Sequence, residues 1–367
     1  MRKGHMVVVM AVLLAALMAG CVGSSGDDAS AQPGIGHEAL DRLIASGELT
    51  PLAEPVVVKI AEDGSPSGAG FYIATERGYF ERLGIKPEFV TFASSAYMLP
   101  SLAAGQVDVA GGICSVSLFN AIERGLDIKI IADKGKNIPG KSYFDLVIAS
   151  DKVDEIRELS DLKGRTICIT SPGSIDELFV DLALKAGGLT KDDVRYVILE
   201  SFTEINPALA SGAVDAAMHI EPLITQGEKN GILDRWIDAT EWAPDFQVAV
   251  VLGSPQFVNE KRHVAERFMV AYLLGLRDYY EAFVLGKGTD EVIKIMTEYT
   301  PMKDEELWHE VNVVGLSPNG EVIEESIADQ LRWFQDMGYF DGEVDLNQVI
   351  DMSLVDYAVG LLGEYEE

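Results

Sequence analysis

The chain has 367 residues, of which 48% are hydrophobic and 24% are charged, a balance typical of a folded globular protein. It carries 29 basic and 59 acidic side chains, a net charge of −30. Such an acidic surface repels the phosphate backbone of nucleic acids, so nucleic-acid binding is excluded as the default function. The length allows two globular units of ordinary size.

The beginning of the chain predicts an export signal. Arg2 and Lys3 precede 14 uncharged and almost wholly apolar residues at positions 6–19. That run is too short to span a bilayer comfortably but suits the apolar region of a signal peptide. It leads into Leu-Met-Ala-Gly-Cys21, which resembles a lipobox. We therefore expect a lipoprotein signal peptide at residues 1–20 and a lipidated Cys21 that anchors the protein outside the cytoplasm; a short buried helix is the alternative.

A flexible segment is expected after this cysteine. Residues 22–36 are rich in Gly, Ser, Asp and Ala, too polar and too rich in glycine to form a core. Leu40, Leu43 and Ile44 then recur at helical spacing, which predicts a short helix. We therefore predict a tether with a short helix over residues 21–55.

The remaining cysteines and the histidines point to no metal site. Cys114 and Cys168 fall in different halves of the chain, so we expect free thiols. The sequence contains no Cys-x-x-Cys motif, and its five histidines are scattered without His-Glu-x-x-His spacing. We predict neither a metal site nor a cofactor.

An internal repeat reveals the organisation of the chain. Pro100–Ala110 matches Pro207–Ala217 at seven of eleven positions, at an offset of 107. Each copy has the pattern of a helix end, a glycine stop and a short buried strand that begins with Val-Asp. Strands alternate with helices around both copies, which predicts parallel sheets buried on both faces. The flanking elements expected are strands Val56–Ile60, Pro87–Phe92, Arg165–Ile169 and Val194–Leu199, and helices Phe71–Leu83 and Ser174–Ala186.

Two further apolar runs, Phe144–Ala149 and Phe246–Leu252, fit neither copy and bracket the second one. We interpret them as two crossings between two α/β lobes, with the second lobe inserted into the first. The predicted first lobe comprises residues 56–149 and 246–367, and the predicted second lobe comprises residues 150–245.

The C-terminal part of the chain is helical in pattern from Lys261 onward and is expected to return to the first lobe. Residues 301–367 hold 17 acidic and 2 basic side chains, which make up half of the net charge. We interpret this stretch as a solvated face; a docking surface for a basic partner is the alternative.

Six short motifs occur in order along the chain. They are residues 66–80 (Pro-Ser-Gly-Ala-Gly-Phe-Tyr-Ile-Ala-Thr-Glu-Arg-Gly-Tyr-Phe), 102–108 (Leu-Ala-Ala-Gly-Gln-Val-Asp), 161–174 (Asp-Leu-Lys-Gly leading into Ser-Pro-Gly-Ser), 214–217 (Val-Asp-Ala-Ala), 221–222 (Glu-Pro) and 277–280 (Arg-Asp-Tyr-Tyr). Together they resemble ABC-transporter solute-binding proteins of the aliphatic-sulfonate, nitrate and thiamine-precursor type (SsuA/THI5-like, NMT1-like).

This resemblance implies an α/β, two-lobed, periplasmic-binding-protein-like (type II) fold with two crossing strands at the hinge. It implies a binding protein and not an enzyme: a monomeric extracytoplasmic receptor that captures a small organic anion or polar heterocycle and presents it to an ABC permease and ATPase complex. Two alternatives stay open. One is an enzyme like the thiamine-pyrimidine synthase of this family, whose iron-associated cysteine cluster has no counterpart in this sequence; the other is a ligand-sensing module.

The candidate site follows from the position of loops in open α/β sheets, where ligands bind beside the carboxyl ends of strands and the N-termini of helices. The corresponding loops are rich in Ser, Gly and Thr, whose N–H and hydroxyl groups favour a negative group. They contain no arginine, which disfavours a bare, doubly charged oxyanion. Helix capping by the same serines is the alternative. The predicted ligand-binding residues are Ser67, Ser94, Ser95, Gly112, Cys114, Ser171, Gly173, Ser174, His219 and Glu221.

Two of these residues directly follow a buried strand. His219 could donate a hydrogen bond to an anion or titrate near neutrality, or it could be a histidine of the cleft wall. Glu221 could receive an amino or amidine-like nitrogen, or form a structural salt bridge. Cys114 lies at a helix start, where the pKa of a thiol falls, and is expected to line the cleft. Trp242 and Phe202 could stack on a flat ligand, although core packing is the simpler interpretation.

Overall fold

The computed structural model describes residues 34–92, 95–142 and 144–366. The predicted signal peptide, the lipobox residue Cys21 and residues 22–33 of the predicted tether lie outside the described residues. Within the described part of the chain, no helix combines the length and the apolar composition that a membrane crossing requires.

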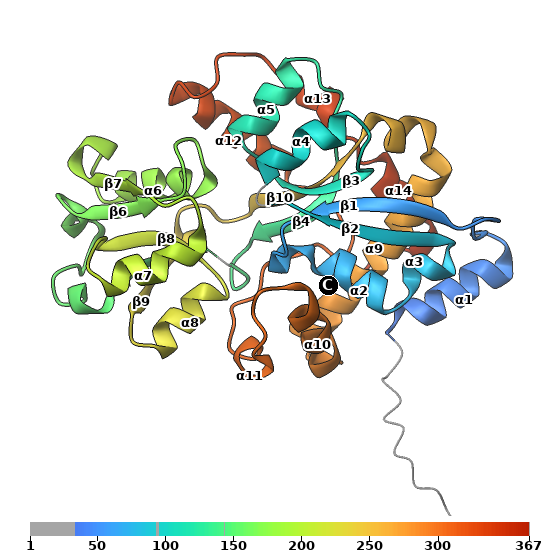
Figure 1. The fold of residues 1–367 in the computed structure, drawn as a ribbon, viewed down its shortest axis with the longest axis horizontal. Helices are drawn as coiled ribbons and strands as arrows, with labels where there is room; N and C mark the ends of the chain where they lie inside the picture. Colours follow the sequence, from blue (N-terminus) through green and yellow to red (C-terminus); the bar gives the residue numbers. More distant parts are fainter. Residues whose placement is uncertain (1–33, 93–94, 143, 367) are drawn as a thin grey trace, which may run out of the picture. The chain divides into compact units, whose positions relative to one another are not determined.

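Two five-stranded sheets are built on one plan (Figure 1). The first sheet consists of β1 (Val56–Glu62), β2 (Ile85–Thr91), β3 (Val109–Ile113), β4 (Lys129–Asn137) and β10 (Phe246–Gly253). The second consists of β5 (Phe144–Ala149), β6 (Thr166–Ile169), β7 (Arg195–Ile198), β8 (Ala216–Ile220) and β9 (Leu233–Asp238). The strand orders, β2-β1-β3-β10-β4 and β7-β6-β8-β5-β9, correspond position by position.

Both sheets are mixed: the repeat strands of each half are parallel, as the sequence predicts, and the two apolar runs add antiparallel strands that the sequence did not predict. β1 pairs in parallel with β2 and β3, and β6 pairs in parallel with β7 and β8. The two apolar runs, β10 and β5, are antiparallel to their neighbours. β5 begins at the carboxyl end of β8, where Phe144 pairs with Ile220, because the chain enters the second sheet from the carboxyl ends of its parallel strands. The residue boundaries of the two lobes stay a prediction.

The repeated Val-Asp pair has the same structural role in both sheets. In the first sheet, Asp108 accepts a hydrogen bond from the backbone N–H of Lys59 at 2.9 Å and donates its own N–H to the Lys59 carbonyl at 2.9 Å. In the second sheet, Asp215 exchanges the same two bonds with Thr166, both at 2.8 Å. Each aspartate therefore joins the start of β3 or β8 to the neighbouring parallel strand.

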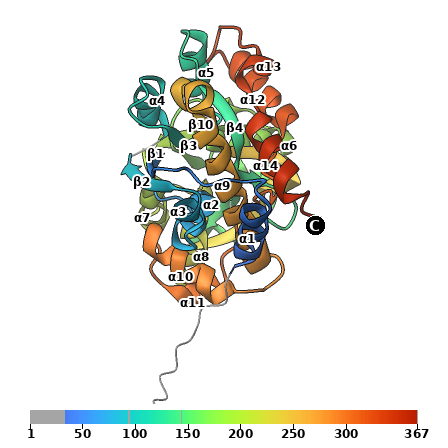
Figure 2. The ribbon, with the colours of Figure 1, turned by 90° about the vertical axis from the view of Figure 1, so that its right-hand side faces the viewer.

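Helices cover the sheets and connect the strands (Figure 1). Those before β6 are α1 (Gly36–Ser46), α2 (Ala69–Glu76), α3 (Tyr79–Arg82), α4 (Ser95–Ala103) and α5 (Val116–Glu123). Those between β6 and β10 are α6 (Ile175–Ala186), α7 (Ile205–Ala210) and α8 (Leu223–Lys229). The rest are α9 (Arg262–Phe283), α10 (Thr289–Tyr299), α11 (Glu305–Trp308), α12 (Glu324–Asp336), α13 (Leu346–Val349) and α14 (Ser353–Leu362). The long helix α9 lies beside α2 (Figure 2).

The helix predicted over Phe71–Leu83 is divided into two in the structure. We expected one helix over Phe71–Leu83, but α2 ends at Glu76 and α3 begins at Tyr79. Gly78 between them has a φ of +70°, a left-handed conformation that glycine adopts without steric cost and that a continuous helix does not contain. The predicted short helix near the start of the body is confirmed as α1, with Leu40 and Leu43 buried.

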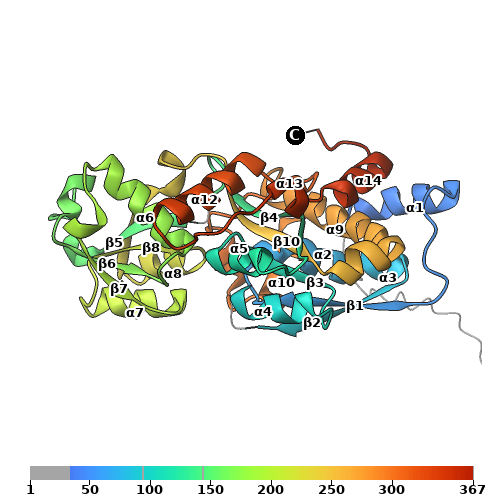
Figure 3. The ribbon, with the colours of Figure 1, turned by 90° about the horizontal axis from the view of Figure 1, so that it is seen from above.

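Helix α12 contacts elements of both sheets (Figure 3). On the first sheet, Ser326 accepts a hydrogen bond from the backbone N–H of Gln247 in β10 at 2.9 Å. Beside the second sheet, the indole N–H of Trp333 donates to Asp181 of α6, the helix that follows β6, at 2.8 Å. This helix belongs to the acidic C-terminal stretch, which is therefore not only a solvated face.

We predict that Asp215→Ala lowers the free energy of unfolding by about 1–3 kcal/mol, because the partly buried N–H of Thr166 loses its acceptor. Urea denaturation followed by circular dichroism measures this difference. Asp192→Ala, at an exposed aspartate of the same half of the chain, is the matched control and should change stability by less than about 0.5 kcal/mol. Equal effects of the two substitutions would contradict the structural role of Asp215.

Candidate functional site

A buried polar cluster lies where the end of β1 and the loop after it meet β4. Lys134, which projects from β4, lies with its Nζ 2.9 Å from Glu62 Oε1 and donates to Ser67 Oγ at 2.8 Å and to Ser65 Oγ at 3.2 Å. The hydroxyl of Tyr72 donates to Glu62 Oε2 at 3.2 Å. Glu62, Ser67 and Lys134 are each at most 3% exposed. The predicted site residue Ser67 thus accepts a hydrogen bond from a buried ammonium group.

The charges in this cluster compensate each other. Burial raises the pKa of the Glu62 carboxyl to about 7, while the neighbouring Lys134 lowers it. A buried ion pair is stable as a pair, and removal of one partner leaves an uncompensated charge. Gly111 of β3 provides the space for this pair, because a Cβ at that position would collide with Glu62 Oε1 and Lys134 Cε.

Sequence reasoning missed Lys134. Because β4 was not assigned as a strand near the site, its charged residues were not considered. The available signal was a run of charged side chains, Asp133, Lys134 and Lys136, directly after the apolar residues that begin this strand. All three are buried in the structure.

Ser95, Gly112 and Cys114 lie close together at the next loops of the first sheet. Ser95 Oγ accepts a hydrogen bond from the Ile113 N–H at 3.2 Å, and a Cβ on Gly112 would lie 3.4 Å from that oxygen. Cys114 is fully buried. Burial raises the pKa of its thiol to about 12, so the expected lowering at a helix start is wrong. Ser94 lies outside the described residues.

On the second sheet, the N-terminus of α6 is occupied by the carboxylates of the chain itself. The Gly173 N–H donates to Glu177 Oε2 at 2.7 Å, and the Thr170 hydroxyl donates to Asp176 Oδ1 at 2.7 Å. Asp176 and Glu177 are each 2% exposed, and burial raises the pKa of the Asp176 carboxyl. Ser174 caps the helix by accepting from the Glu177 N–H at 3.3 Å. The groups that we expected to attract an anion therefore already have anionic partners.

Loops from the two sheets meet at this point. A Cβ on Gly173 would lie 3.0 Å from Val116 Cγ2, at the start of α5, and 3.4 Å from the ring of Tyr339. Tyr339 also donates its hydroxyl to Glu177 Oε1 at 2.9 Å. The neighbouring Ser171 is exposed. The structure thus brings the predicted loop 171–174 against the predicted loop that leads into α5.

His219 is fully buried in β8. Its Nε2 lies 3.2 Å from Asn206 Oδ1, and its Nδ1 has no hydrogen-bond partner among the described residues. Burial lowers the pKa of its imidazole to about 3, so the predicted titration near neutrality is wrong. Phe202 lies against it, with ring centroids 6.3 Å apart. His219 is therefore neutral and offers a fixed ring nitrogen, not a switchable charge.

Glu221 belongs to a buried ionic network, the salt-bridge alternative considered from the sequence. Arg235 of β9 pairs with Glu221 and with Asp145 of β5, and its Nε lies 3.2 Å from Glu228. Burial raises the pKa of the Asp145 carboxyl to about 7, although Arg235 lowers it. Glu221 Oε1 also accepts from the backbone N–H of Asn312 at 3.2 Å. Whether Glu221 also contacts a ligand stays a prediction.

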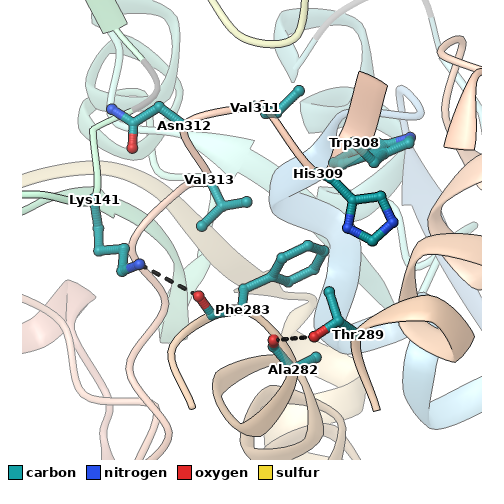
Figure 4. A pocket seen from close by; sticks show the side chains of 9 residues that line it. All are labelled: Lys141, Ala282, Phe283, Thr289, Trp308, His309, Val311, Asn312 and Val313. Carbon is teal, nitrogen blue, oxygen red and sulfur yellow. Dashed lines mark hydrogen bonds between the residues drawn. The ribbon is translucent and has the colours of Figure 1, made fainter. Parts of the chain in front are cut away.

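Two cavities are lined by other residues, although Asn312 in the wall of the smaller one donates its N–H to Glu221. The smaller, of about 190 Å³, is formed by Lys141, the end of α9, the start of α10 and the segment from α11 to Val313 (Figure 4). There the Lys141 ammonium donates to the Phe283 carbonyl at 3.4 Å. The larger, of about 600 Å³, lies between α6, α12 and residues 242–246. Of the predicted site residues that the structure describes, none lines either of these cavities.

The family of the chain is decided by comparison with known proteins. Residues 65–282, more than half of the chain, match the family model described as NMT1/THI5 like. The chain belongs to the NMT1/THI5-like family. Within this family-matched region lie the Glu221 network, the α6 terminus and the Lys134–Ser67 bond, whereas Glu62 precedes it.

Curated relatives of this NMT1/THI5-like chain match it in part. One, named "Putative binding protein BAB2_1146", comes from Brucella abortus (strain 2308) and is 30% identical over 152 residues, 41% of this chain. Another, named "Putative thiamine biosynthesis protein", comes from Haemophilus influenzae and is 28% identical over 154 residues, 42% of this chain. The matches span 44% and 46% of these relatives' own lengths.

The similarity to solved structures extends over more of the chain than the similarity to these relatives. The periplasmic aliphatic sulphonate binding protein of Escherichia coli has a TM-score of 0.67 at 16% identity, over 81% of this chain and 92% of that one. The periplasmic nitrate-binding protein of Synechocystis PCC 6803 has a TM-score of 0.67 at 14% identity, over 84% and 90%. At these identities the likeness shows the fold alone, and it confirms the predicted periplasmic-binding-protein fold.

We predict that Lys134→Met lowers the free energy of unfolding by about 3 kcal/mol at pH 8, because Glu62 stays buried without the ammonium group that compensates its charge. The loss should shrink toward pH 5, because the raised pKa of Glu62 lets the folded state keep a proton that the unfolded chain, with an ordinary pKa of 4.5, releases. Stability of this variant therefore falls as the pH rises from about 5 to 8.

Urea denaturation at the two pH values tests this, with Glu62→Gln/Lys134→Met as the matched control. The double variant carries no carboxyl at position 62 and should lack the extra pH dependence. A loss in Lys134→Met that is the same at both pH values would contradict the assignment.

Proposed function

We propose that this protein is the extracytoplasmic receptor of an ABC importer, held at the membrane as a monomer by a lipid on Cys21. In this function it captures a small polar solute and presents it to a permease and its ATPase. The family and the fold support the proposal, since the structural relatives named above are binding proteins. The observation that carries it is the meeting of the loop before α6 with the start of α5, where Gly173 faces Val116.

This arrangement supports a closure of the two halves over the solute. Loops at the carboxyl ends of both sheets supply polar groups, and only a closed form contacts the solute from both sides. A solute that binds the closed form more tightly shifts the population toward it. The proposed contacts are Ser67, Ser95, Gly112, Ser171, Gly173 and Ser174, with His219 and Glu221 on the wall of the second sheet.

The charges favour one of the two solute classes expected from the sequence. Lys134 is already paired with Glu62, and the N–H groups of Thr170 and Gly173 before α6 already donate to Asp176 and Glu177. An anion would meet two buried carboxylates at α6 and no uncompensated cation at Ser67. We therefore propose a neutral polar heterocycle that donates hydrogen bonds, such as an aminopyrimidine, and not a sulfonate or nitrate.

A thermal-shift comparison of aminopyrimidines with alkanesulfonates and nitrate tests this proposal. A true solute at 100 times its Kd should stabilise the protein by about 2.7 kcal/mol. It should bind with one-to-one stoichiometry and be recovered unchanged in mass after denaturation. Stabilisation by sulfonate or nitrate alone would contradict the proposed class, and chemically altered solute would favour an enzyme of the thiamine-pyrimidine type.

We predict that Ser67→Ala raises the Kd for that solute about tenfold, because it removes a hydroxyl held at the proposed contact by Lys134. Isothermal titration calorimetry measures the change. Ser211→Ala, the same substitution at an exposed serine after α7, should leave the Kd unchanged. If both variants bind equally well, the solute does not contact the loop after β1.

We predict that Cys21→Ala moves the protein from the membrane fraction to the soluble fraction of the cells that produce it. The reason is that a diacylated cysteine supplies the proposed anchor, whereas the described body contains no membrane-crossing helix. Fractionation with immunoblotting measures the distribution. Cys168→Ala, at a buried thiol of the second sheet, is the control and should stay membrane-bound. A Cys21→Ala variant that still sediments with membranes would contradict lipid anchoring.

A further inference from the structure

The larger cavity has the dimensions of a small-molecule site. Its volume of about 600 Å³ falls within the range typical of ligand pockets, whereas the cavity of about 190 Å³ falls below it. Its walls are α6, α12 and the segment 242–246 that leads into β10. Figure 3 shows α12 beside α6, in agreement with the bond between Trp333 and Asp181.

The wall of the cavity is apolar and aromatic. Leu178 and Leu182 of α6 line one side, and Trp333 of α12 lines another. Trp242 and Phe246 also line it. The Trp333 indole is fixed, because its N–H donates to Asp181 Oδ2 at 2.8 Å. Two indoles and a phenyl ring at one cavity suit a flat aromatic molecule.

An acceptor without a partner lies in the same wall. Gln330 lines the cavity and is fully buried. Its Nε2 donates to the Gln247 carbonyl at 2.8 Å and to Ser326 Oγ at 3.3 Å, which fixes the orientation of the amide. Its Oε1 has no hydrogen-bond partner among the described residues. Because a buried acceptor without a donor is costly, this oxygen indicates a ligand that carries an N–H or O–H group.

The rim of the cavity is negative. Asp245, Glu325, Asp329 and Asp336 line it and are exposed. Arg332 is the cation among the lining residues, and it pairs with Asp329. Acidic side chains around an opening attract a cation and repel an anion. An aromatic wall strengthens this preference, since a cation is also attracted to the face of an indole.

We propose that this cavity is a second small-molecule site, separate from the solute loops, and that it binds an arylalkylammonium ion whose ring carries an N–H group. The ring packs between Trp242 and Trp333, the ring N–H donates to Gln330 Oε1, and the ammonium group lies among the carboxylates of the rim. This inference does not depend on the importer function, because none of the proposed solute contacts lines the cavity.

Tryptamine has all three features and is the probe for the test. The full chain is labelled with 5-fluorotryptophan, and its four tryptophans, Trp236, Trp242, Trp308 and Trp333, give fluorine resonances that Trp→Phe variants assign. Addition of tryptamine should shift the resonances of Trp242 and Trp333. Those of Trp236 and of Trp308, which lines the smaller cavity, should not move.

Matched probes separate the three contacts. 1-Methyltryptamine lacks the ring N–H and should bind at least about fivefold more weakly, since Gln330 Oε1 stays without a donor. Indole-3-propionate keeps the ring and reverses the charge, so it should cause no shift. These comparisons leave the protein unchanged and need no variant that risks misfolding.

Variants of the exposed rim test the location. Asp245→Asn/Asp329→Asn should raise the Kd of tryptamine roughly fivefold, whereas Asp341→Asn, an exposed aspartate outside the cavity, should not. No shift of Trp242 and Trp333 up to about 10 mM tryptamine would overturn the proposal. So would equal binding of indole-3-propionate, an unchanged Kd in the rim variant, or an equal loss in Ser67→Ala, which would place the probe at the solute loops.

Discussion

The need to compensate buried carboxylates governs both halves of the candidate site. A carboxylate removed from water is tolerated only where a cation or several donors replace its hydration. Glu62 meets this need with Lys134, and Glu177 meets it with the Gly173 amide. Arg235 does the same for the acids around the end of β8. Since these partners belong to the chain, the loops carry hydrogen-bonding groups but little net charge.

The parts of the fold that are encoded locally could be predicted from the sequence. The patterns of strands and helices predicted the corresponding elements of the two sheets. The repeat was recognised from the Val-Asp pairs, and the structure shows that Asp108 and Asp215 have the same hydrogen-bonding role. The ionic partners could not be predicted, because Glu62 and Lys134 are far apart in the chain and meet only after β4 joins the sheet. The position of Glu177 in the first turn of its helix could be predicted. Its hydrogen bond from the Gly173 N–H could not, because that bond depends on the fold of the preceding loop.

Helix α12 connects features that the sequence treated separately. Ser326 and Gln330 form hydrogen bonds with Gln247 of the first sheet. Trp333 forms a hydrogen bond with α6, the helix that follows β6 of the second sheet. The cavity beside it is therefore walled by elements of both sheets. A molecule bound there would contact elements of both halves, as proposed for the solute at the loops, but through a different set of side chains.

The network around Arg235 has a consequence for how this family can vary. One guanidinium serves Asp145, Glu221 and Glu228, so its loss would leave three carboxylates with one fewer partner at once. A substitution of Arg235 by a neutral residue should preserve stability only if Asp145 and Glu221, the two buried acids, are also replaced by neutral residues. Across related chains these positions should therefore covary: a chain with a neutral residue at one of them should also have neutral residues at the others.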